Sequence, residues 1–131
     1  MDDADRLDHT LALVVQRVGD PAPLVFDRLF AEAPELQALF CNDASGAVRA
    51  EMFLRALECL QDAVGARQFS AGLVAAEHAT HQGYGVSTAQ FQRFFVLMVE
   101  VFRDALGPDW TAATDGAWAR ALQRLATPGP V

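Results

Sequence analysis

Hydrophobic residues recur along the chain at the three- and four-residue spacing that places them on one face of an α-helix. Strict alternation of apolar and polar residues over four or more positions is missing, and β-branched residues do not cluster between turns, which argues against strands. The pattern predicts an all-α fold of about six to eight helices. The expected helical segments are 7–18, 23–30, 34–40, 48–64, 69–82, 88–106 and 114–125.

Turn-forming sequences separate these segments. The breaks are predicted at GDPAP (19–23), CNDASGA (41–47), GAR (65–67) and GPDW (107–110). Ser87 and Gln90 have the spacing of a capping box, which predicts a helix start at about Thr88. The helix over 88–106 is apolar on most sides, so we expect it to be central and buried.

Within the segment 48–64, helical spacing predicts one inward stripe, and a second inward face is expected on the last helix. The stripe over 48–64 comprises Phe53, Leu54, Leu57, Leu60 and Val64. The inward residues of the last helix are expected to be Trp118, Leu122 and Leu125.

The composition is that of one globular domain. The chain has 131 residues, of which 52% are hydrophobic and 21% charged, so residues 1–131 are expected to form a single domain with a frayed tail at 126–131. A net charge of −7 without a basic stripe argues against nucleic acid and anionic membranes. The apolar runs are too short for a membrane span, and the acidic start lacks a secretory signal, so a cytoplasmic location is expected. Two cysteines are too few for a disulfide framework.

Two of the three histidines, His78 and His81, lie three residues apart before the sequence GYGV. Helical histidines are most often solvated or hydrogen-bonded residues. Together with Glu77 the pair could supply ligands to zinc, but the sequence offers no firm third ligand. A Ser-His-Asp arrangement is compatible with the spacing, although no nucleophile motif supports it.

Three landmarks occur in a fixed order: PELQALF at 34–40, HQGYGVSTAQF from His81 to Phe91, and Trp118 within GPDWTAATDGAWARAL. Taken together they resemble a globin, over nearly the whole chain from Leu7 to Leu125. The sequence is most similar to single-domain bacterial globins and to the globin part of flavohaemoglobins, and the stretch 106–122 is similar to the last helix of neuroglobin.

The resemblance implies a haem b cofactor whose iron is held by one histidine. Counting back from Val86 and Phe91 makes His81 the proximal ligand, with Glu77 one turn earlier, where globins usually carry leucine. A second alignment makes His78 the ligand, with Val74 one turn earlier. In either case the other ring nitrogen should donate a hydrogen bond to a carbonyl or hydroxyl oxygen.

On the distal side the resemblance places Arg49, or Ala50 after a one-residue shift, at the position of the usual distal histidine or glutamine. Phe26 occupies the position that is tyrosine in flavohaemoglobins, and no histidine falls on the distal helix. Arg49 could reach a haem propionate or the bound ligand, or remain a solvated arginine. The residues expected to bind the cofactor are His81, Phe40, Val86, Phe91, Phe53, Leu54, Phe26, Arg49 and Tyr84.

The function that the resemblance implies is reversible binding of O2 or another diatomic gas (CO or NO), for transport or sensing. Two alternatives remain open: a nitric oxide dioxygenase or peroxidase-like enzyme that needs a separate reductase, and a haem-free signalling module. Apolar residues on the first and last helices could also form a homodimer face.

Overall fold

The structure of the chain is a computed structural model that describes residues 1–65 and 70–126. All regular elements in these ranges are helices, which confirms the all-α prediction. The elements are α1 (Asp3–Val18), α2 (Ala22–Glu32), the 3₁₀ helix η1 (Pro34–Phe40), α3 (Ala47–Ala63), α4 (Ser70–Gly83), α5 (Thr88–Leu106), the 3₁₀ helix η2 (Gly107–Asp109) and α6 (Ala112–Ala126).

Most predicted ends agree with these bounds within two residues. The capping box at the start of α5 is present, with the Ser87 side chain and the Gln90 side chain each accepting from the other residue's backbone N–H. The short helix after Pro34 is a 3₁₀ helix, and α6 starts two residues before the predicted Thr114. The predicted start at Phe69, part of the predicted break at 65–67 and the predicted tail beyond Ala126 lie outside the described residues.

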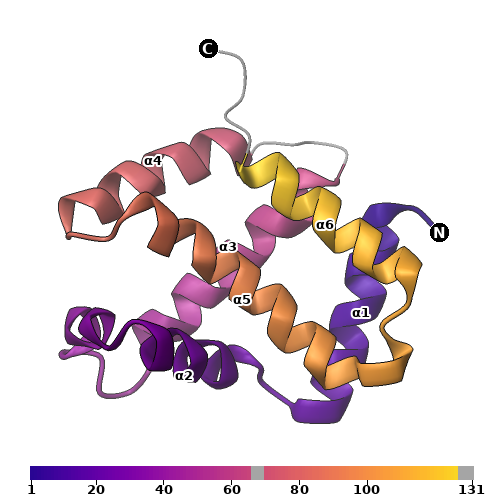
Figure 1. Cartoon of the computed structure of the whole chain (residues 1–131), viewed down its shortest axis with the longest axis horizontal. Helices are drawn as coiled ribbons and strands as arrows, with labels where there is room; N and C mark the ends of the chain where they lie inside the picture. Colours follow the sequence, from indigo (N-terminus) through magenta and orange to yellow (C-terminus); the bar gives the residue numbers. More distant parts are fainter. Residues whose placement is uncertain (66–69, 127–131) are drawn as a thin grey trace.

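Helix α5 runs through the middle of the molecule (Figure 1) and packs against α1, α2, α4 and α6. Its residues Phe94, Leu97, Met98, Val101 and Phe102 are buried, so the prediction of a central helix is confirmed. Trp118 of α6 is fully buried against the Phe102 ring, whose centroid lies 5.2 Å away. Among the described residues, no helix is both long and apolar enough to cross a membrane.

The buried stripe of α3 differs in part from the predicted one. Phe53 and Leu60 are buried, as expected, whereas Leu54 is 51% exposed. The other buried positions of α3 are Ala56, Cys59 and Ala63, at the helical spacing from Phe53. Consecutive helical residues point about 100° apart, and small side chains complete the stripe in place of Leu54. The prediction that Leu54 shares the inward face is therefore wrong.

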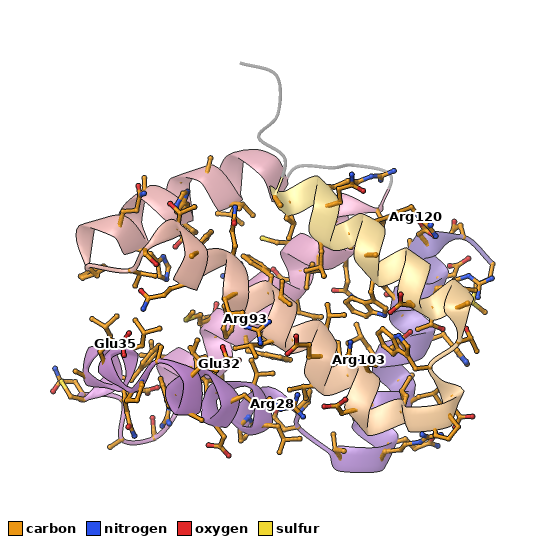
Figure 2. All side chains as sticks on the ribbon, viewed as in Figure 1. Arg28, Glu32, Glu35, Arg93, Arg103 and Arg120 are labelled. Atoms are coloured by element: carbon orange, nitrogen blue, oxygen red, sulfur yellow. The ribbon has the colours of Figure 1, made fainter. Side chains whose placement is uncertain are left out.

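Ion pairs join α2 to α5 across the surface. Arg93 of α5 forms an ion pair with Glu32 of α2 at 2.7 Å and another with Glu100, about two turns further along α5, at 3.0 Å. Figure 2 shows Arg93 directed toward Glu32. Arg28 of α2 pairs with Asp104 at 2.6 Å. The Arg93 hydrogen bond lowers the pKa of Glu32. These contacts hold α2 against α5 from Arg93 near its start to Asp104 in its last turn.

Candidate functional site

A cavity of about 940 Å³ lies between α3 and α4 and is completed by the end of η1 and the start of α5. Helix α3 contributes seven lining residues, and four of them follow spacings of four, four and three, which put them on one helical face. These four are Val48, Met52, Ala56 and Cys59. Two charged residues of the neighbouring stripe, Glu51 and Arg55, also line the cavity.

The opposite wall comes from α4 and α5. Helix α4 provides Val74, Glu77 and His81, each about one turn from the next, and α5 provides a cluster of aromatic rings. The aromatic residues of this wall are Phe91, Phe94 and Phe95, joined by Leu39 and Phe40 from η1. Most of the lining is apolar, and the volume lies near the upper end of the roughly 300–1,000 Å³ of cofactor and ligand sites.

His81 is the imidazole on this lining, and its orientation is fixed by its own helix. Its Nδ1 lies 2.7 Å from the backbone carbonyl oxygen of Glu77, one turn earlier. Because a carbonyl oxygen can only accept, Nδ1 must carry the proton and donate it. In the neutral ring Nε2 then keeps a free lone pair, and no described residue forms a hydrogen bond with it. An imidazole in this state can bind a metal.

The chain turns sharply after His81. The backbone N–H groups of Tyr84 and Val86 both donate to the His81 carbonyl oxygen at 3.0 Å, and Gly85 has a φ of +86°. A left-handed backbone at Gly85 is available to glycine at little cost. The turn leads directly into the capped start of α5, which brings Phe91 within 5.3 Å of the His81 ring.

His78 is placed differently. Its Nε2 lies 2.9 Å from the Thr88 hydroxyl, and its ring stacks on Phe91 with centroids 5.0 Å apart and a 17° angle between planes. It is not part of the cavity lining. Both histidines therefore contact the Phe91 ring, but only His81 lines the cavity, whereas His78 is in polar contact with the start of α5.

The cavity also contains acidic groups and a thiol. Arg55 pairs with Glu51 at 2.8 Å and with Glu58 at 3.7 Å, whereas the Glu77 carboxylate lies 3.9 Å from Nδ1 of His81. Burial, together with the nearby carboxylates of Asp62, Glu58 and Glu77, raises the pKa of the Cys59 thiol. A thiol that keeps its proton is a poor metal ligand, so His81 is the better donor of the two.

The loop before α3 is held by Asp43, whose side chain is 5% exposed. Its two carboxylate oxygens accept from the backbone N–H groups of Val48 and Arg49, each at 3.0 Å. The Arg49 side chain donates to the Asp43 carboxylate at 3.1 Å and to the Asp43 carbonyl at 3.0 Å. Burial alone would raise the pKa of Asp43, but these hydrogen bonds outweigh it and hold the pKa below its usual value.

The predicted cofactor-binding residues divide into three groups: those on the cavity lining, those buried elsewhere in the core, and those in neither place. Those on the cavity lining are His81, Phe40, Phe91 and Tyr84. Phe26 is buried behind the lining, with its ring 5.5 Å from Phe40 and 5.3 Å from Phe94, and Phe53 and Val86 are buried in the core. The lining does not include Leu54, Arg49 or the runner-up ligand His78.

Several lining residues were not predicted from the sequence, above all Val48, Met52, Ala56 and Cys59. The signal that could have identified them is their spacing of four, four and three residues over one helical face. It was obscured because the larger residues Phe53, Leu54 and Leu57 suggested a different face. Among the described residues, no group of three or more His, Cys, Asp or Glu side chains could hold a metal ion.

Comparison with known proteins gives one match. The globin family model matches residues 24–128, which span α2 to the end of α6 and include every residue of the cavity lining. Neither the curated proteins nor the solved structures with which the chain was compared gave a significant match. The family match covers well over half of the chain and agrees with the all-helical architecture around one α3–α4 cavity. The chain belongs to the globin family.

Proposed function

We propose that the chain binds haem b in the α3–α4 cavity through Nε2 of His81 and reversibly binds a diatomic gas on the haem iron. The observation that carries the proposal is the His81 geometry: Nδ1 donates to the Glu77 carbonyl at 2.7 Å, while the ring lines the cavity. Metal-bound histidines commonly have such a hydrogen bond on the nitrogen that faces away from the metal.

The lining fits the group. Haem is a flat, largely apolar macrocycle that needs one axial imidazole, and one histidine together with aromatic and aliphatic walls meets this need. Phe40, Phe91 and Phe94 would pack against the macrocycle. Arg55 is the arginine on the lining, and it would have to leave Glu51 and Glu58 to pair with a propionate. A single imidazole also suits a metal that brings its other ligands with it.

The iron of bound haem supplies the coordination position for O2, CO or NO, and the residues of the chain decide how that position is surrounded. The α3 stripe of Val48, Met52 and Ala56 has no side-chain hydrogen-bond donor. The guanidinium of Arg49 is already bonded to Asp43 outside the lining. We therefore expect gas binding in an apolar environment, in which bound O2 receives little stabilisation from hydrogen bonds.

The test is purification of the chain with haem, followed by difference spectra with CO and O2. The expected result is one haem b per chain with a Soret band that shifts reversibly with each gas. A chain that takes up no haem would overturn the proposal and favour a haem-free signalling role. Rapid turnover of NO with a supplied reductase would make the chain a nitric oxide dioxygenase instead of a reversible gas binder.

A further inference from the structure

Glu77 is unusual among the residues that line the cavity, because it contacts the His81 ring through two different groups. Its backbone carbonyl oxygen accepts the Nδ1 proton at 2.7 Å. Its carboxylate oxygen Oε2 lies 3.9 Å from the same nitrogen. Both oxygens therefore lie on the side of the ring opposite the free lone pair of Nε2.

The arginine on the lining, Arg55, is bonded to carboxylates other than that of Glu77. Among the described residues, Glu77 has no arginine within ion-pair distance, because Arg55, the lining cation, is paired with Glu51 and Glu58. The side chain of Glu77 is 53% exposed, so solvent screens its charge in part. Its distance to Nδ1 is nevertheless well inside the screening length of about 8 Å at physiological salt.

A negative charge beside the proton of an imidazole strengthens the donation from the other ring nitrogen. A proton that is attracted by an anion leaves more electron density on the ring, which makes the lone pair a stronger ligand. A stronger, more anionic ligand stabilises the ferric ion, which carries one more positive charge than the ferrous ion. Ligand identity and the hydrogen bonds around it are known means of setting haem potentials.

We propose that Glu77 is a positioning residue for His81 whose carboxylate lowers the reduction potential of the iron that His81 binds. This inference rests on the proposed function, and it adds a redox property that gas binding alone does not require. A lower reduction potential favours the ferric state, which suits a chain that exchanges electrons with a reductase or reports oxidising conditions.

The experiment compares the midpoint potential of the haem-loaded wild-type chain with that of Glu77→Gln, which removes the charge and keeps the side chain's size. The expected result is a rise in potential that increases the ratio of ferrous to ferric protein about tenfold at a fixed poise, equal to about 59 mV for one electron. The frequency of the iron–imidazole stretch in the ferrous protein should fall in the same variant, because the ligand donates less strongly.

Glu51→Gln is the matched control, since it removes one carboxylate from the same cavity at a residue that contacts Arg55 and not His81. Its potential should shift by less than a third as much. An equal shift would attribute the effect to net charge and overturn the role of Glu77. An unchanged potential and stretching frequency in Glu77→Gln, with haem retained, would overturn it as well.

Glu77→Leu is a second variant that tests the proposal if Glu77→Gln loses its haem. Leucine extends the apolar lining, so this variant should bind haem well. It should retain haem and show the same rise in potential, and a potential equal to that of the wild type would contradict the proposal. Haem content is measured on the wild type first. A wild-type chain without haem overturns the proposed function itself, whereas a haem-loaded chain that is insensitive to Glu77 overturns only this inference.

Discussion

The two walls of the cavity differ in how they are made polar. On the α4–α5 wall, one imidazole is fixed by a 2.7 Å bond to its own helix and a ring contact with Phe91. On the α3 wall, the stripe of Val48, Met52 and Ala56 is apolar, and the flanking Glu51 and Arg55 are paired with each other. Arg49, which precedes most of the stripe, is bonded to Asp43 of the loop. The α4–α5 wall thus presents one oriented imidazole, whereas the stripe on the α3 wall presents only apolar side chains.

The two histidines of α4 differ in the hydrogen bonds that orient their rings. His81 and His78 are chemically identical and three residues apart, yet only His81 has its Nδ1 proton bonded and its ring in the cavity. Local hydrogen bonds, and not residue type, therefore distinguish the two histidines, and they are the reason for which we propose His81 as the ligand.

Replacing the two histidines separately should give the largest effect. His81→Ala should abolish haem binding or weaken it severely, because it removes the nitrogen that we assign to the iron. His78→Ala should retain haem, since its Nε2 contacts Thr88. Titration of each purified apoprotein with haem, followed at the Soret band, measures the difference. Retention by His81→Ala together with loss by His78→Ala would move the ligand to His78, and retention by both would contradict the assignment of His81 as the required ligand.

Truncation of the aromatic lining should have the next largest effect. Phe40→Ala removes a ring that packs against Phe26 and Phe30 at 5.5 and 5.6 Å. The free energy of unfolding should fall by about 2–5 kcal/mol, and haem should be lost faster. Leu54→Ala is the control, because Leu54 is half-exposed and should cost less than about 1 kcal/mol. Urea unfolding of both variants tests this, and equal losses would show that Phe40 does not support the cavity.

The helix types and most helix ends could be predicted from the sequence because they depend on local signals: apolar periodicity, Ser87 with Gln90, and the glycine- and proline-containing turns. The face of α3 could not be predicted in the same way. Large residues such as Leu54 suggested one face, whereas the cavity is lined by Met52 and by small residues whose position depends on packing against α4. The contact between Asp43 and Arg49 could not be predicted either, because it depends on how the loop before α3 folds back on that helix.

Acid should weaken the contact between the loop before α3 and the start of that helix, because this contact depends on Asp43. The pKa of Asp43 is lowered on folding, so the carboxylate stabilises the native chain above the pKa it has when unfolded, about 3.9, and this contribution is lost as the pH falls through the lower native value. Asp43→Asn should be less stable than the wild type at neutral pH, and the difference should shrink toward low pH. Unfolding curves across this range measure it, and a difference that does not depend on pH would contradict the role of the charge.

Arg49→Leu should have the smallest effect on gas binding. Because the guanidinium is bonded to Asp43 outside the lining, the O2 dissociation rate should change less than about threefold, or under about 0.7 kcal/mol. Stopped-flow displacement of O2 by CO measures this rate. A rise of tenfold or more in this rate would mean that Arg49 donates a hydrogen bond to the bound gas, and the comparison of the two walls would then be wrong.

The most direct test of the difference between the walls is the absorption spectrum of the haem-loaded ferrous chain without added gas. The only histidine besides His78 and His81 is His9, which is exposed on α1, so α3 has no imidazole to offer. We predict the spectrum of high-spin iron bound by one imidazole, and this spectrum should change at once when CO is added. A low-spin spectrum with two imidazole ligands would contradict it.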